Sequence, residues 1–150
     1  MSISKKTPPS HNPMEQIFYK GGYKYQLAEV YKVQTTIKPA VAISTPFIRL
    51  DLAGVLTILK GYAWDGPSGP TVDTKSFMRG SLVHDALYEL MRKGFLDPLT
   101  HRITADKLLR QMCKEDGMYS VRAWWVYHSV RKFGYKSASK ENKKKIIKAP

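Results

Sequence analysis

The chain has 150 residues, of which 43% are hydrophobic, and its formal net charge at neutral pH is +13. This length and composition predict one globular domain with its own core, and they exclude a disordered chain and a small disulfide-dependent scaffold. No apolar run is long enough for a membrane span, and Cys113, the single cysteine, cannot form an internal disulfide.

The first half of the chain is predicted to form strands. Residues 1–14 are polar and rich in proline, and we expect a loose segment there, followed by a globular domain over residues 15–134. Two β-type runs, 47–50 and 55–59, are joined by residues 51–54, which suit a hairpin. Apolar residues also alternate at Tyr23, Tyr25, Leu27, Tyr31 and Val33.

Three helices are predicted in the second half, at about 76–93, 104–116 and 120–133. Thr104 is the predicted N-cap of the second helix. Glycines stand at the expected helix ends, as C-terminal caps do, at Gly94, Gly117 and Gly134. The fold class is therefore α+β, with a small antiparallel sheet before three helices. We interpret the large side chains of the third helix as packing residues: Trp124, Trp125, Tyr127 and Phe133.

The first predicted helix carries two ionisable residues, His84 and Asp85, at the border of its apolar face. Burial of such groups is costly unless they are paired or bound to a cation. Asp106 borders the apolar face of the next helix, and an antiparallel neighbour could present it to His84. The alternative is a structural histidine with a hydrogen-bonded neighbour, and an Asp106 that only favours the helix dipole.

The loop before the first helix offers oxygen ligands for a cation. Asp65 and Gly66 lie in a segment rich in Gly and Pro, residues 61–70, which can turn several carbonyl groups toward one point. Carboxylate and carbonyl oxygens are the ligands that calcium prefers. The alternative is a tight turn in which Asp65 caps its own backbone.

The order of these segments resembles the small bacterial and fungal phospholipases A2. The resemblance covers residues 61–134 and rests on an Asp-Gly-Pro-Ser loop at 65–68, a His-Asp-x-x-Tyr helix ending at Tyr88, then Arg102 with Asp106, and an Arg-Ala-Trp-Trp run that leads to Phe-Gly. Most of the chain also resembles a widespread phage-encoded domain of unknown function, marked by an Asp-Gly/Ala-Ser loop and a His-Asp-x-x-Tyr motif.

The phospholipase resemblance implies a helical core of that type and a role for each motif residue. His84 would be the general base that activates water, and Asp106 would orient its imidazole. Tyr88 would support the second carboxylate by a hydrogen bond. A calcium ion would be bound by Asp65, Gly66 and Asp85.

Two features separate the chain from those phospholipases, which are secreted and disulfide-bonded. A cysteine commonly precedes their catalytic histidine, whereas Leu82 and Val83 precede His84 here. Residues 1–10 lack the apolar region of a signal peptide, so folding in a reducing compartment is expected. With the phage resemblance, the expected location is the bacterial host cytoplasm or the phage virion.

Positive charge is concentrated at the C-terminus. Residues 131–150 contain eight Lys or Arg and one acid, Glu141, which is a net charge of +7 out of +13. We expect residues 135–150 to form a basic tail, dispensable for folding, in which the stretch from Lys136 to Lys148 attracts nucleic acid or anionic lipid. A solvated tail without a partner is the alternative.

Three functions remain open from the sequence. The first is a calcium-dependent, phospholipase A2-like hydrolysis of a phospholipid ester, favoured by the combination of Asp65, His84, Asp85 and Asp106. The second is a non-catalytic phage structural or accessory protein that contacts other particle proteins, favoured by the lack of disulfides and of a signal peptide. The third is a basic module that binds nucleic acid or a membrane surface.

Overall fold

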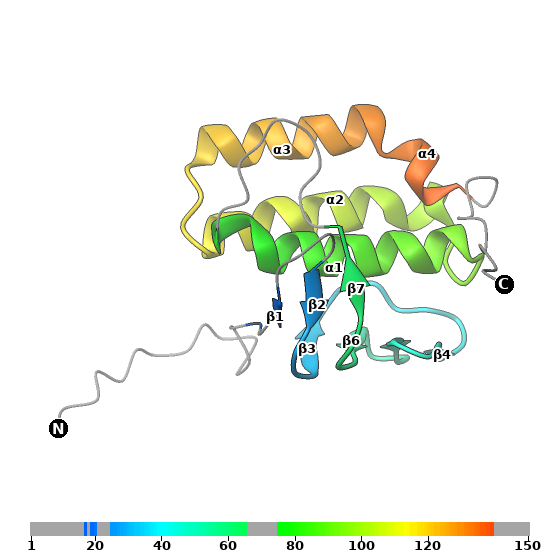
Figure 1. Cartoon of the computed structure of the whole chain (residues 1–150). Coiled ribbons are helices and arrows are strands. Elements are labelled where there is room, and N and C mark those ends of the chain that lie inside the picture. Colours follow the sequence, from blue (N-terminus) through cyan, green and yellow to red (C-terminus); the bar gives the residue numbers. More distant parts are fainter. Residues whose placement is uncertain (1–16, 18, 21–24, 66–74, 140–150) are drawn as a thin grey trace, which may run out of the picture. The chain divides into compact units, whose positions relative to one another are not determined.

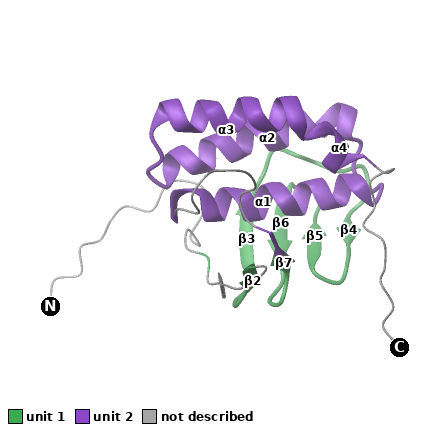
Figure 2. Cartoon of the chain, turned by 45° about the horizontal axis from the view of Figure 1, so that its top comes forward, with its two compact units in different colours: residues 1–63 green, residues 64–150 purple. Residues whose placement is uncertain are grey.

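The structure is a computed structural model that describes residues 17, 19–20, 25–65 and 75–139. Short strands precede the helices along the chain, which confirms the predicted α+β class (Figure 1). The chain divides into two compact units, Met1–Ala63 and Trp64–Pro150 (Figure 2).

The first unit is built from short antiparallel strands. One sheet has the strand order β3-β6-β5-β4, and a second has the order β1-β2-β7, where β7 contains the boundary between the units. The strands are β1 Tyr19–Lys20, β2 Tyr25–Leu27, β3 Tyr31–Gln34, β4 Ile43–Ser44, β5 Ile48–Leu50, β6 Val55–Ile58 and β7 Ala63–Trp64.

Alternation of apolar and polar residues gives the larger sheet one buried face. In β3, Tyr31 and Val33 are buried while the residues that follow each of them are exposed. The register places Val33 opposite Leu56 of β6, and Leu56 opposite Leu50 of β5. All three are buried, so the period-two pattern of the sequence maps onto one side of the sheet.

The hairpin between β5 and β6 forms where it was predicted. Oδ1 of Asp51 accepts hydrogen bonds from the backbone N–H groups of Ala53 and Val55, at 3.0 and 2.9 Å. Gly54 adopts a φ of 89°, a backbone conformation that is strained for a residue with a side chain.

The second unit contains the four helices α1 Lys75–Arg92, α2 Pro98–Glu115, α3 Ser120–Phe133 and α4 Tyr135–Ala138. Successive long helices run antiparallel, and α2 packs against both α1 and α3 (Figure 1). Ala138 of α4 is fully buried, so the helical unit continues past Gly134. Among the described helices, none combines the length and the apolar character needed to cross a membrane.

The long helices end in two different ways. Gly94 and Gly117 have positive φ angles, and each helix is closed by a backbone bond from the following residue, Phe95 to Leu90 and Met118 to Cys113. Gly134 is instead right-handed, with φ of −80°. A Cβ atom there would lie 2.5 Å from the carbonyl oxygen of Val130 and 2.7 Å from the Tyr88 hydroxyl, so the close approach of α3's own backbone and of α1 explains this glycine.

The predicted start of the second helix at Thr104 is wrong. α2 begins at Pro98, and its N-cap is Asp97, whose side chain accepts a hydrogen bond from Leu99 N at 3.1 Å and from the Thr100 hydroxyl at 2.8 Å. Proline at the first helical position has no N–H that needs a partner. Thr104 therefore lies inside the helix.

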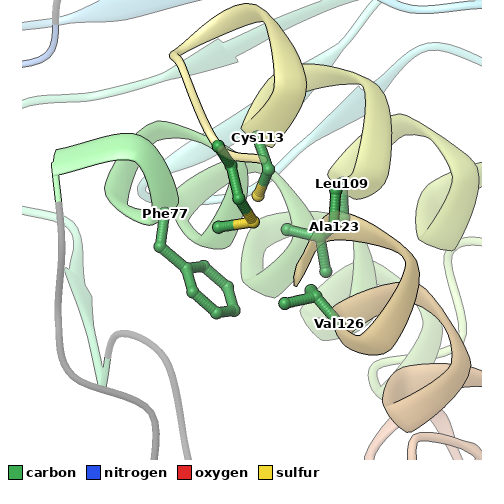
Figure 3. Close-up of a cluster of buried hydrophobic side chains, with 6 residues drawn as sticks. Phe77, Leu109, Cys113, Ala123 and Val126 are labelled. Atoms are coloured by element: carbon green, nitrogen blue, oxygen red, sulfur yellow. The ribbon is translucent and has the colours of Figure 1, made fainter. Parts of the chain in front are cut away.

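Buried hydrophobic side chains fill the core between the helices. One cluster consists of Phe77, Leu109, Cys113, Met118, Ala123 and Val126 (Figure 3). Burial raises the pKa of the Cys113 thiol to about 12, so it packs as an apolar group.

The interpretation of the large α3 side chains as packing residues is wrong for Trp124, Trp125 and Phe133, which are exposed. The buried residues of α3 are Ala123 and Val126, on the side of the helix away from Trp124 and Trp125, while Tyr127 is half-buried. The two tryptophans therefore do not face the core, and Phe133 is exposed at the end of the helix.

Candidate functional site

The centre of the candidate site is the carboxylate of Asp106, which is completely buried on α2. Four polar side chains surround it: His84 and Tyr88 from α1, Arg102 from α2 and Arg131 from α3. We call these five residues the Asp106 network. All of them lie in the second unit.

Helix α1 presents His84 and Tyr88 together because residues four apart on a helix are neighbours. Their ring centroids are 4.1 Å apart. Nε2 of His84 lies 2.7 Å from Oδ1 of Asp106, and the Tyr88 hydroxyl donates to the same oxygen at 2.6 Å. The contact predicted between His84 and Asp106 is present, and Tyr88 supports this carboxylate by a hydrogen bond.

Two arginines complete the network, and neither was predicted to have a role in the site. Nη1 of Arg131 donates to Oδ2 of Asp106 at 2.8 Å, and Nη1 of Arg102 lies 3.6 Å from the same oxygen. Arg102 also donates to the carbonyl oxygens of Val130 and Arg131 near the end of α3. The sequence signal for Arg102 is its i, i+4 spacing from Asp106, whereas no spacing links Arg131 to that residue.

The contacts of the network decide which of its groups are charged. Burial alone would raise the pKa of Asp106, but hydrogen bonds from His84, Tyr88 and Arg131 outweigh this effect and lower it. Burial and the neighbouring carboxylate raise the pKa of Tyr88. Burial opposes the charged form of His84, yet hydrogen bonding to Asp106 and the charge of nearby carboxylates raise its pKa overall. Asp106 is therefore ionised and Tyr88 is neutral at pH 7.

The ionised Asp106 fixes the tautomer of neutral His84. A carboxylate can only accept hydrogen bonds, so the 2.7 Å contact assigns the imidazole proton to Nε2. The lone pair then lies on Nδ1, which is 3.9 Å from Oδ1 of Asp85 and thus beyond a direct hydrogen bond. His84 can accept a proton at Nδ1, on the side of Asp85.

Asp85 lies at the edge of this buried region, with 35% of its side chain exposed. The protein atoms around the rest of the carboxylate raise its pKa by desolvation, against the opposing effect of His84. The negative charge of Asp65, which is exposed on the same unit, raises the pKa of Asp85 further. The positive charge of Arg92 opposes this rise in pKa, and a cation bound beside Asp85 and Asp65 would oppose it further.

The remaining predicted calcium ligand, Gly66, lies outside the described residues, as does the rest of the loop 66–74. In the described ranges, no group of three or more His, Cys, Asp or Glu side chains could hold a metal ion. Two carboxylates suit a hard cation such as calcium, and further oxygen ligands would have to come from the loop after Asp65.

Comparison with known proteins gives a match to a protein family. The model of the family described as "Protein of unknown function (DUF1353)" matches residues 25–130, a span that includes His84, Asp85, Tyr88 and Asp106. Neither the curated proteins nor the solved structures include a match to the chain.

Proposed function

The chain belongs to this family of proteins of unknown function, and we propose that it is a phospholipase A2-like, calcium-dependent ester hydrolase. In this proposal, His84 activates a water molecule for attack on an acyl ester of a phospholipid. The observation that carries the proposal is the contact between Nε2 of His84 and the buried Asp106 carboxylate, because it leaves Nδ1 as the basic atom.

The Asp106 network supports the role of His84 as a general base. When water gives a proton to Nδ1, the imidazole becomes positively charged, and the adjacent ionised carboxylate stabilises that charge. Tyr88 and Arg131 donate to the two oxygens of Asp106 and hold it in position. A fixed orientation of the imidazole favours proton transfer, because the transfer requires hydrogen-bond distance and alignment between His84 and the water molecule.

The proposed calcium ion would be held by Asp85 and Asp65, with carbonyl oxygens around Gly66. Held by these residues, calcium would supply positive charge against the negative charge that develops on an ester oxygen. Asp85 lies directly after His84 in the chain, and its Oδ1 is the charged atom that faces Nδ1. The exposed part of Asp85 would thus place substrate and water on the basic side of the imidazole.

The test is release of fatty acid from phospholipid vesicles, measured for the full chain with calcium and with a chelator. We expect calcium-dependent release, and we expect His84→Ala to lower the rate by at least about a hundredfold. His101→Ala is the matched control, because His101 is another histidine of the helical unit, on α2, and is not one of the five residues of the Asp106 network. No release by the folded wild-type protein, or equal rates for the wild type and His84→Ala, would contradict the proposal.

A non-catalytic role is the second candidate, and the Asp106 network also supports it. Its contacts join α1, α2 and α3 through one buried carboxylate, as a purely structural network would. In that case the protein is a phage structural or accessory protein, located in the host cytoplasm or the virion. Asp106→Asn would then lower stability in a protein that hydrolyses no ester.

A further inference from the structure

The outward side of α3 carries a continuous row of exposed residues. The row begins at Val121, and its other residues follow three, four, seven and eleven positions later, a spacing that places all of them on one side of the helix. We call this row the α3 stripe; it consists of Val121, Trp124, Trp125, His128 and Lys132. The exposed fractions are 72% for Val121, 44% for Trp124 and 63% for Trp125.

The stripe reverses the usual pattern of an amphipathic helix. The side of α3 that packs on the unit carries the smaller residues Ala123, Val126 and Val130. The stripe residues contact each other: the rings of Trp124 and His128 are 4.1 Å apart, and Trp125 lies edge-on to Trp124 at 5.6 Å. A row of large apolar groups exposed in this way marks an interaction site.

The charge of α3 indicates what the partner is. The helix contains Arg122, Arg131 and Lys132 but no Asp or Glu, and the whole chain has a net charge of +13. Arg131 is paired with Asp106, so Lys132 is the basic residue of the stripe itself. Exposed tryptophans combined with basic residues are typical of helices that lie in a membrane interface. Long basic side chains reach the phosphates while the apolar groups enter below them. This combination is complementary to an anionic lipid surface.

Other partners fit the stripe less well. Pairing with a second copy would bring two identical acid-free helices together, and like charges would oppose it. A nucleic acid strand could stack on Trp124 and Trp125, but Val121, the most exposed apolar residue of the stripe, offers a base neither a ring nor a hydrogen bond. The acyl region of a membrane favours Val121 and the tryptophans alike.

We propose that the α3 stripe docks the protein on an anionic phospholipid surface. The helix lies in the plane of the interface, Val121, Trp124 and Trp125 insert among the headgroups, and Lys132 binds phosphate. This inference goes beyond the proposed hydrolase, because docking needs neither His84 nor calcium.

The test measures binding of the full chain to vesicles of phosphatidylcholine and phosphatidylglycerol in equal parts, with a chelator present. The double variant Trp124→Ala/Trp125→Ala should bind at least about tenfold more weakly, a loss of about 1.4 kcal/mol, since it removes two large apolar groups that would be buried in the lipid. Phe95→Ala, which removes an exposed aromatic side chain outside the helices, should bind as the wild type does. Equal melting temperatures would establish that all variants are folded.

Brominated lipid gives a second readout, because the only other tryptophan is Trp64, which is buried. Vesicles should quench the fluorescence of the wild type, and the double variant should lose this quenching. Equal vesicle affinity of the double variant and the wild type would overturn the inference. If the double variant also lost affinity for single-stranded DNA, the stripe would instead be a nucleic-acid surface. This outcome is independent of ester hydrolysis.

Discussion

At the scale of single residues, one carboxylate organises the candidate site. Oδ1 of Asp106 receives two contacts from α1, and Oδ2 is paired with Arg131 of α3. A buried ion pair adds little net stability when compared with a well-packed apolar core, but loss of one partner is costly because the other is left buried and unpaired. Asp106 is completely buried, whereas 30% of the Arg131 side chain is exposed, so Asp106 is the partner that matters more.

Asp106→Asn should therefore lower the free energy of unfolding by about 3 kcal/mol at pH 7. The folded-state pKa of Asp106 is lowered, so its stabilising effect is complete above the unfolded value of about 3.9 and is lost as the pH falls through the folded value. Urea unfolding of the wild type and the variant from pH 7 to about pH 3 measures this. The difference between them should shrink in acid.

Asp51→Asn is the control for this measurement, because Asp51 caps an exposed hairpin far along the chain from the network. Its effect on stability should be small, as expected for an exposed turn. A constant difference between wild type and Asp106→Asn over the whole pH range would mean that the charge of Asp106 is not what stabilises the fold.

The same residues show which parts of the site could be predicted from the sequence. His84 and Asp106 were predicted to meet because each borders an apolar face, and a polar group in that position needs a partner. Arg131 was not predicted, since a basic residue in the last turn of a helix is already explained by the helix dipole. Its contact with Asp106 depends on how α3 packs against α2, which local spacing does not determine.

At the scale of helices and strands, periodicity predicted the elements better than their ends and faces. The β5–β6 hairpin and the limits of α3 are as expected, because alternation and helical spacing are local properties. The start of α2 was missed since His101 and Arg102 interrupt the apolar pattern. The face of α3 was wrong because both sides carry apolar residues, and core geometry selects the smaller ones, Ala123 and Val126.

Substitution of the two candidate caps of α2 distinguishes the observed helix start from the predicted one. Asp97→Ala should lower the free energy of unfolding by about 1 kcal/mol, because it removes the acceptor for Leu99 N and the Thr100 hydroxyl. Thr104→Ala should change it by less than about 0.5 kcal/mol, since Thr104 lies inside the helix. Chemical denaturation measures both, and a larger loss for Thr104→Ala would mean that α2 starts later.

At the scale of the whole molecule, the boundary of the basic tail determines what the tail can be. α4, Tyr135–Ala138, lies within the segment expected to be dispensable. Ala138 is buried, and the carbonyl oxygen of Ser137 accepts a hydrogen bond from Arg92 of α1 at 2.9 Å. Lys136 therefore belongs to the helical unit, while residues 140–150, with five lysines and one acid, lie outside the described residues.

Two truncations distinguish the C-terminal residues that stabilise the fold from those that only carry charge. Ending the chain after Ser139 should leave the melting temperature within about 2 °C of the wild type, because the removed residues carry few apolar groups and many like charges. Ending it after Gly134 should lower the melting temperature by several degrees, since α4 and the Arg92 bond are lost. Differential scanning calorimetry distinguishes the two, and an equal loss of stability for both would place residues 140–150 in the folded core.

The truncation after Ser139 also tests how the basic tail binds. It removes five lysines and keeps the α3 stripe, so binding to anionic vesicles and to DNA should weaken and should depend less on salt. Residual vesicle binding at about 0.5 M salt, where charges are screened within roughly 4 Å, should then still require Trp124 and Trp125. If the affinity of the full chain for vesicles and DNA does not fall as the salt concentration rises, a shaped binding site, and not the charge of the tail, binds these partners.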